Sequence, residues 1–292
     1  MITVRLKGGL GNQMFQYAFA LNIARKNKTT VEFDLTFLEG RNPGIGVVAR
    51  NYELDIFGIE PVRANKKNII IDRHYFKNPI LNELSKKILG KNRKRISDKR
   101  LKFKSKYLNL KDNIYLDGYW QSEKYFLDIK NEIKDLYKVK KKIPVRIQAL
   151  FNEINFNPKS VCVHNRRGDF LTSPMHEALG QNYYEVAEKL LLEKISSPFL
   201  YVFSDDINWC KENLKFKSNA VFVDDSFAGP RVEFYFELMK ACKHFIVSNS
   251  TFAWWAAYLP RNKDKIVIAP KKWLISTTLD TSHIVPNDWI TI

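Results

Sequence analysis

Residues 160–169 read SVCVHNRRGD, and this stretch decides the fold prediction. The short apolar run SVCVH is typical of a buried strand, and two adjacent arginines follow it at once. Cationic side chains beside a buried strand are costly unless an anionic group meets them, and the planar fork of arginine suits phosphate. Gly168 lets the backbone come close to a ligand, although an ion pair between Arg167 and Asp169 is an alternative. The pattern predicts an anion site at the strand end.

Outward from this strand, the second half of the chain alternates between strand and helix patterns. The predicted strands are 199–203, 220–223, 245–247 and 266–269, and the predicted helices are 183–196, 231–243 and one ending at 259. Such alternation predicts an α/β fold with a parallel, doubly wound sheet. Ligands of these sheets bind at the carboxyl ends of the strands.

Two more polar clusters fall at predicted strand ends. Ser204-Asp205-Asp206 offers carboxylates for a base N–H or a ribose hydroxyl, or else an N-cap for a helix through Trp209. Ser248-Asn249-Ser250-Thr251 opens a helix, where hydroxyls and free N–H groups bind anions. A simple N-cap is the alternative there too, although one cap does not need four polar residues.

The first half begins with a strand over 1–7 and the turn Gly8-Gly9-Leu10-Gly11, after which Asn12 is predicted to cap a helix to about Asn27. The turn lacks the spacing of a P-loop. Strands are expected at 31–34 and 114–118 and a helix at 123–137, while 41–113 shows no clear pattern. Residues 138–158 are the predicted linker, with a helix expected at 145–154. They separate two expected domains, 1–145 and 146–292.

The charge favours anionic partners, because 48 Lys and Arg against 31 Asp and Glu give a net charge of +17. Lys86–Lys106 holds eleven basic residues and one acid, Asp98, and Lys138–Arg146 is also basic. These stretches fit a solvated face or a contact with anionic lipid. Nucleic acid is not expected as a partner, since no recognisable binding motif accompanies the charge.

Cysteine usage and hydropathy point to the cytoplasm. Cys162, Cys210 and Cys242 are odd in number and widely spaced, so they predict buried free thiols in a reducing compartment. No signal-peptide pattern opens the chain, and no apolar run approaches the roughly 20 residues of a spanning helix. We therefore expect a cytoplasmic protein, with the inner membrane as a possible peripheral contact.

Three strings together resemble the α-1,2-fucosyltransferase family: 8–17 (GGLGNQMFQY), 164–169 (HNRRGD) and 248–255 (SNSTFAWW). The resemblance implies a GT-B arrangement, in which two Rossmann-like domains face each other across a cleft. Residues 1–145 would form the acceptor side, and 146–292 would bind GDP-fucose. It further implies an inverting transfer of L-fucose from GDP-β-L-fucose to the 2-hydroxyl of a galactose, with no metal and no cofactor.

The resemblance also implies a role for each matching residue. Arg166 would contact the β-phosphate, His164 would lie against the ribose or guanine, and Arg167 would brace Asp169. The remaining donor contacts would come from Asp205 or Asp206 at the guanine or ribose, and from Ser248, Asn249, Ser250 and Thr251 around the phosphates. Asn12 would approach the fucose or the acceptor oxygen. The expected general base is Asp169, with His176 and Glu177 as second candidates.

Alternatives to this function remain at the level of sequence. A fucosyltransferase could act on a protein or an internal GlcNAc instead of galactose, and a basic protein could bind glycans or polyanions without catalysis. The lack of an anchor differs from Golgi members of the family and suggests a bacterial enzyme. Such an enzyme would build lipopolysaccharide or another surface glycan on a lipid carrier, held to the inner leaflet by its basic stretches.

Overall fold

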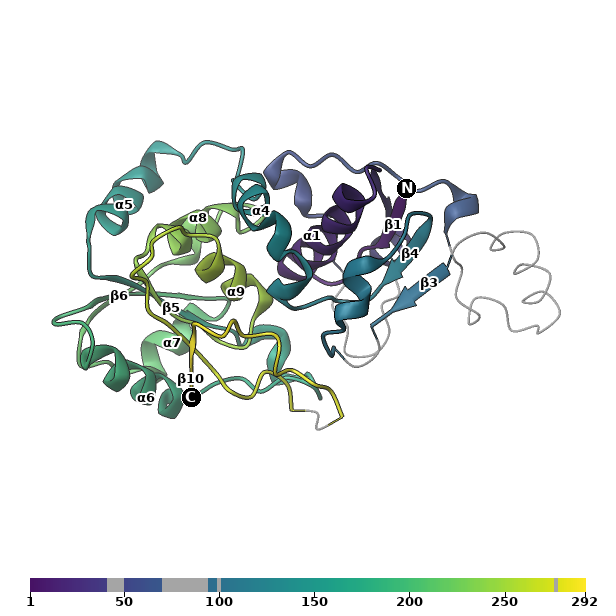
Figure 1. The fold of residues 1–292 in the computed structure, drawn as a ribbon. Helices are drawn as coiled ribbons and strands as arrows, with labels where there is room; N and C mark the ends of the chain where they lie inside the picture. The colour runs from purple at the N-terminus through teal and green to yellow at the C-terminus, as the bar shows by residue number, and fades with distance from the viewer. Residues whose placement is uncertain (41–49, 70–93, 99–100, 276–277) are drawn as a thin grey trace. The chain divides into compact units, whose positions relative to one another are not determined.

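The computed structural model describes residues 1–40, 50–69, 94–98, 101–275 and 278–292. The chain divides into two compact units, Met1–Ile133 and Lys134–Ile292 (Figure 1). The expected boundary at 145/146 falls within the second unit, at the start of helix α5 (Val145–Phe156). Each unit is built on its own parallel sheet, so the predicted α/β class with Rossmann-like units is confirmed.

The first unit holds a four-stranded sheet in the order β2-β1-β4-β3. All its strand pairs are parallel. Its elements are β1 (Ile2–Arg5), α1 (Leu10–Lys26), β2 (Val31–Asp34), α2 (Thr36–Glu39), β3 (Lys94–Ser97) and β4 (Ile114–Asp117). The chain order reverses between β1 and β4, which places the turn after β1 at the point where such sheets bind ligands.

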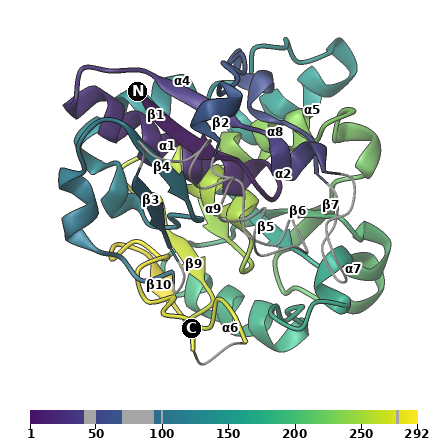
Figure 2. The same cartoon turned by 90° about the vertical axis from the view of Figure 1, so that its right-hand side faces the viewer.

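The second unit holds a six-stranded parallel sheet in the order β10-β9-β8-β5-β6-β7. Its strands are β5 (Ser160–Asn165), β6 (Phe199–Ser204), β7 (Asn219–Phe222), β8 (His244–Ile246), β9 (Val267–Ala269) and β10 (Ile290–Thr291). Its helices are α4 (Lys130–Leu136, which crosses the unit boundary), α5, α6 (Gln181–Leu192), α7 (Ile207–Asn213), α8 (Glu233–Ala241) and α9 (Thr251–Tyr258). Helices α6 and α7 cover one face of this sheet, while α5, α8 and α9 cover the other (Figures 1 and 2).

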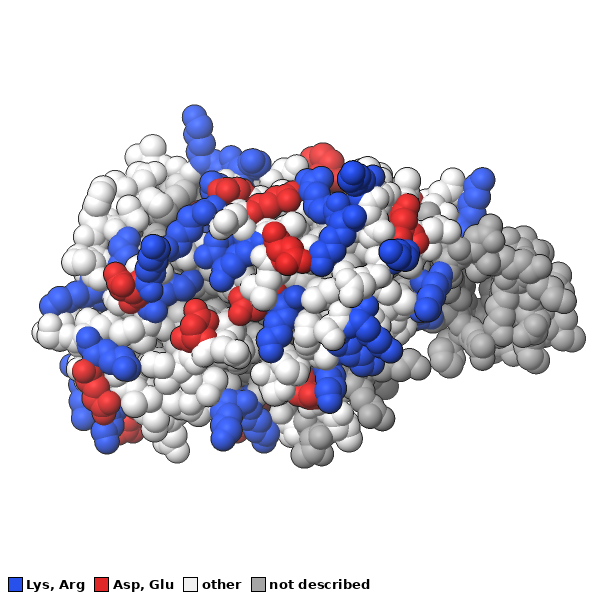
Figure 3. Space-filling view, viewed as in Figure 1, with Lys and Arg blue, Asp and Glu red and all other residues white. Residues whose placement is uncertain are grey.

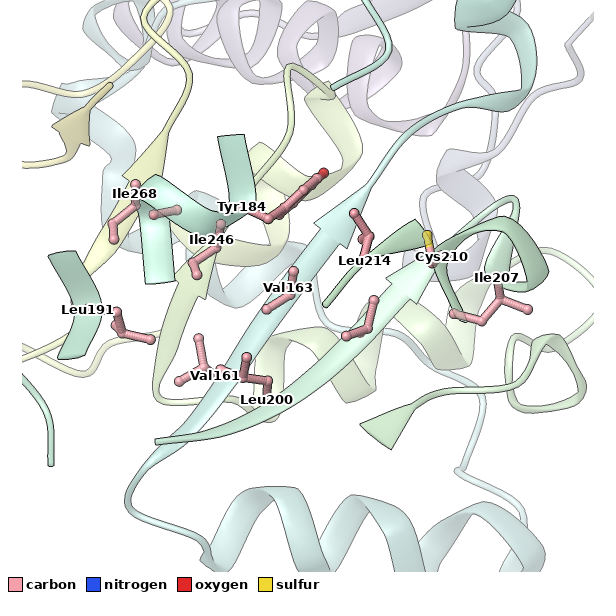
Figure 4. Close-up of a cluster of buried hydrophobic side chains, with 12 residues drawn as sticks. Val161, Val163, Tyr184, Leu191, Leu200, Ile207, Cys210, Leu214, Ile246 and Ile268 are labelled. Atoms are coloured by element: carbon pink, nitrogen blue, oxygen red, sulfur yellow. The ribbon is translucent and has the colours of Figure 1, made fainter. Parts of the chain in front are cut away.

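The core under α6 and α7 follows from the alternation of side chains along the strands. Val161 and Val163 of β5 point to this face and pack with Tyr184 and Leu191 of α6 (Figure 4). Cys162 and His164 have the opposite parity and therefore face α8 and α9. The predicted buried thiols are confirmed, since Cys162, Cys210 and Cys242 are all buried and free of disulfides.

One predicted helix is wrong in its first half. Residues 123–137 form two short 3-10 turns, Glu123–Tyr125 and Leu127–Ile129, before α4 begins. Phe126 between them has φ −142° and ψ 21°, outside the helical region, and its side chain is fully buried. The chain therefore leaves the helical conformation at a residue whose ring lies in the core.

Basic side chains are dispersed over the surface rather than gathered in one patch on the face shown in Figure 3, where acidic groups lie between them. Of the basic stretch Lys86–Lys106, residues 86–93 and 99–100 lie outside the described residues. Within the described part of the chain, no helix has the length and apolar character needed to cross a bilayer.

Candidate functional site

The candidate site lies where the strand order of the second sheet reverses. From β5 the chain proceeds to β6 and β7 on one side, and then to β8, β9 and β10 on the other. The crevice of such a sheet opens at the carboxyl ends of the two strands that flank the reversal, here β5 and β8. The arginine motif follows β5 and the Ser-Asn-Ser-Thr cluster follows β8, so the fold brings two of the predicted clusters together.

Arg166 is held between two carboxylates at this edge. Its Nε and Nη2 donate to Asp169 Oδ1 at 3.0 and 2.8 Å, and its Nη1 lies 3.1 Å from Asp205 Oδ2. Gly168 makes this arrangement possible, because a Cβ there would stand 2.5 Å from Asp205 Oδ2. The side chain of Arg166 keeps 24% of its surface exposed, so an anionic ligand can still reach it.

Arg167 has different partners from those predicted. Its backbone N–H donates to Asp205 Oδ1 at 2.9 Å, its Nε donates to Asp206 Oδ2 at 3.2 Å, and its guanidinium stacks 3.7 Å from the Trp209 ring centroid. The carboxylate of Asp169, expected to pair with Arg167, pairs with Arg166. The expected brace between Arg167 and Asp169 stays a prediction. Asp206 also accepts from the Trp209 backbone N–H and caps α7, as the alternative reading of that cluster predicted.

His164 and Ser248 join the two sides of the reversal. The His164 Nδ1 and the Ser248 Oγ lie 2.9 Å apart, and both side chains are buried. Burial, reinforced by the nearby Arg166 charge, lowers the pKa of His164 to about 3, so the imidazole is neutral near pH 7. Ser250 is the N-cap residue of α9, but its side chain makes no capping hydrogen bond. A cap alone does not explain this serine.

Two asparagines of the motifs have a role that sequence reasoning missed. Asn165 Nδ2 donates to the carbonyl of Leu179 and Asn249 Nδ2 to that of Glu177, at 3.0 and 3.1 Å. Both side chains are buried, and together they tie the segment before α6 to the ends of β5 and β8. Asn165 is a polar residue at the end of a fully buried strand, and this position was the sequence feature that could have indicated the anchoring role.

His176 and Glu177, the second candidates for a base, differ in their surroundings. The His176 ring stacks on Phe170 at 4.3 Å between centroids, and its Nδ1 lies 2.9 Å from Ser173 Oγ. Burial lowers the pKa of this histidine. The Glu177 side chain is mostly exposed and lies 3.7 Å from Lys272 Nζ. The His176 ring therefore packs against other side chains of its segment, whereas the Glu177 carboxylate lies at the surface.

Asn12 lies in the first unit, at the equivalent reversal between β1 and β4. It does not cap α1, because the N-cap residue is Gly9, and Asn12 is in the first helical turn. Its Oδ1 accepts from Gln121 Nε2 at 2.7 Å. Gly8 has φ +75°, and a Cβ there would stand 2.5 Å from Asn12 Nδ2. The role expected for Asn12 at the sugar stays a prediction.

Metal ligands are not grouped in the described part of the chain: among those residues, no three His, Cys, Asp or Glu side chains gather in a way that could hold an ion. The charged groups at the carboxyl edge are two arginines and the three carboxylates that pair with them, Asp169, Asp205 and Asp206. The neutral imidazole of His164 lies beside α9, with its ring centroid 6.2 Å from that of Phe252. The first N–H groups of that helix favour an anion.

Comparison with known proteins places these features in context. The model of the family described as glycosyl transferase family 11 matches residues 1–292. The chain is 30% identical over 306 residues to an alpha-1,2-colitosyltransferase of Escherichia coli, covering 100% of this chain and 99% of the relative. It is 31% identical over 309 residues to the O-antigen biosynthesis glycosyltransferase WbnK of Escherichia coli, covering 98% and 99%. A galactoside alpha-(1,2)-fucosyltransferase 2 of Rattus norvegicus is 28% identical over 273 residues, covering 89% and 67%.

Proposed function

Because the chain belongs to glycosyl transferase family 11, it is a glycosyltransferase, and we propose that it moves L-fucose or colitose from a GDP-linked donor to the 2-hydroxyl of a galactose. The predicted membership of the α-1,2-fucosyltransferase family agrees with this match. The names of the relatives support the linkage, since each of the two whose names print a linkage is an α-1,2 transferase.

The observation that carries the proposal is the position of Arg166 at the strand-order reversal, held by Asp169 and Asp205. When the bond between the sugar and the diphosphate breaks, negative charge grows on the β-phosphate. A guanidinium that is already oriented stabilises this charge without reorganisation. In this proposal Arg166 supplies the positive charge that a divalent ion supplies in other transferases, and the reaction inverts the anomeric centre without a metal.

The neighbouring groups complete the donor site. In this proposal the neutral imidazole of His164 would lie beside the nucleoside, and Ser250 and Thr251 would contact the phosphates together with the first N–H groups of α9. Ser248 is fully buried against His164 Nδ1, and its expected phosphate contact stays a prediction. Asp205 and Asp206 align the two arginines, and their expected contacts with the ribose or guanine stay a prediction.

Colitose is the second candidate for the transferred sugar, because the E. coli colitosyltransferase matches this chain over its full length. Colitose is fucose without its 3-hydroxyl, so a site that hydrogen-bonds that hydroxyl would prefer fucose strongly, whereas an apolar wall would accept both. The acceptor proposed is a galactose of a surface glycan on a lipid carrier. The exposed basic residues of 138–146 would then rest on anionic lipid.

The test is a transfer assay with purified protein, GDP-fucose and GDP-colitose, and a panel of galactosides and GlcNAc-terminated glycans, followed by linkage analysis of the product. We expect an α-1,2 product on galactosides and a higher melting temperature with GDP but not with ATP. Transfer to GlcNAc or to protein alone would contradict the proposed acceptor. Polyanion binding with no response to GDP would contradict the whole proposal.

A further inference from the structure

The segment between the 3-10 turn Gly168–Leu171 and α6 is irregular but firmly anchored. Its carbonyls at Met175, Glu177 and Leu179 accept hydrogen bonds from the Ile275 N–H, the Asn249 side chain and the Asn165 side chain. These bonds measure 2.9, 3.1 and 3.0 Å. The two buried asparagines come from the ends of β8 and β5, so His176 in the middle of the segment is fixed beside the strand-order reversal.

The packing around His176 connects it to the proposed phosphate-binding arginine. Its ring stacks on Phe170 with an interplanar angle of 23°, and the Cζ of Arg166 lies 5.9 Å from the centroid of that same Phe170 ring. The imidazole and the guanidinium are thus neighbours of one aromatic ring. Both groups therefore border the carboxyl edge of the sheet at which the proposed donor site lies.

We infer that His176 is the general base that accepts the proton of the acceptor hydroxyl, an inference that rests on the proposed function. As the acceptor oxygen bonds to C1 of the donor sugar, its proton passes to Nε2 of His176. The electron pair of the bond between C1 and the phosphate oxygen leaves with GDP, beside Arg166. The imidazolium afterwards returns its proton to solvent.

Asp169, the base expected first, is a poorer candidate because of its bonds. One of its oxygens already accepts two N–H groups from Arg166, so that oxygen is engaged in the ion pair rather than directed at an acceptor hydroxyl. For His176, the Ser173 Oγ accepts from the Met175 N–H at 3.2 Å and has a second lone pair for Nδ1–H. That tautomer leaves the lone pair of Nε2 available.

The electrostatics agree with a neutral base near pH 7. Burial lowers the pKa of His176 from its ordinary value, the carboxylate of Asp169 opposes this shift, and the guanidinium of Arg166 adds to it. Glu177 and Lys272, the next charged groups along these elements, pair with each other at the surface. Burial lowers the pKa of His164 to about 3, so an acidic limb that lies well above that pH does not come from His164.

The experiment compares His176→Gln with Met175→Leu, an exposed neighbour whose backbone bond is unchanged, across pH 4.5–8.5. For His176→Gln we expect kcat/KM to fall by about 10²–10⁴-fold, the acidic limb of the pH profile to disappear, and GDP affinity to stay within about twofold. His176→Ala should regain part of its rate with added imidazole, which a purely structural role would not allow. Melting temperatures confirm that each variant is folded.

Three results would overturn the assignment: an unchanged acidic limb in His176→Gln, no rescue of His176→Ala by imidazole, or the same loss and altered profile in Glu177→Gln. These outcomes differ from a failure of the proposed function. In that case the unchanged protein itself gives no transfer from either GDP-sugar, and the role of His176 falls with it.

Discussion

Replacing Arg166 by lysine separates charge from geometry at the proposed donor site. The arginine makes two contacts with Asp169 and one with Asp205, at 2.8–3.1 Å. A lysine keeps the charge but meets only one carboxylate. Exposed ion pairs contribute about 0.2–1 kcal/mol each, and these are partly exposed, so the free energy of unfolding should fall by only about 1 kcal/mol.

The effect on turnover should be larger than the effect on stability. Loss of one charge-assisted hydrogen bond to the departing diphosphate costs about 1.5–3 kcal/mol, which corresponds to about 10–150-fold in kcat/KM. Arg166→Ala, which removes the charge as well, should lose about 10³-fold or more. The assay is initial-rate transfer from the GDP-sugar, with chemical denaturation for stability. Arg261→Lys, at a surface pair with Asp135, is the control.

If both Arg166→Lys and Arg261→Lys turn over within about threefold of the unchanged protein, the guanidinium of Arg166 makes no hydrogen bond to the departing diphosphate that lysine cannot replace, and this reasoning is refuted. If activity falls only in proportion to the folded fraction, the arginine is structural and the proposed phosphate contact is wrong.

Three further predictions concern the same edge of the sheet. Asn249→Ala removes the side-chain N–H groups that donate to the carbonyls of Glu177 and Trp273, so the free energy of unfolding should drop by about 1–3 kcal/mol. The value of kcat should fall more than the affinity for GDP. Equal falls in kcat and GDP affinity would argue against a positioning role. Because the pKa of His164 is lowered in the folded state, only the unfolded chain binds a proton at this residue between pH 6.5 and about 3. The free energy of unfolding should therefore decline as the pH falls through this window, by about 2 kcal/mol at pH 5. In His164→Gln, chemical denaturation at several pH values should show a less steep decline. Transfer should be unaffected by EDTA, and recovery on adding Mg²⁺ or Mn²⁺ after a loss would contradict the metal-free proposal.

The sequence predicted the strands whose apolar runs are continuous and failed on those that are not. β5 and β6 are buried along almost their full length, and both were found from the pattern. β3 (KRIS) has only Ile96 buried, and β10 is two residues long, so neither carries a pattern that marks a strand. β3 and β10 are strands because they hydrogen-bond to neighbouring strands, β4 and β9, and not because of their own residue pattern.

The candidate site shows the same division. Which residues stand at strand ends followed from local sequence, so the arginine motif and the cluster after β8 were found. Which carboxylate meets which arginine depends on β6 lying beside β5, a contact between residues about forty positions apart that no local pattern contains. For this reason the contacts of Arg167 with Asp205 and Asp206 were not predicted. The anchoring by Asn165 and Asn249 was missed for the same cause.

The three buried thiols give the second unit an internal reporter of its own opening. Burial raises the pKa of Cys210 to about 11 and that of Cys162 well above its ordinary value, so neither reacts with a maleimide or disulfide reagent while the sheet is closed. The rate of cysteine labelling therefore reports how often the second unit opens enough to expose these thiols. Measured on each variant above, it distinguishes a protein that has lost chemistry from one that opens too often to perform it.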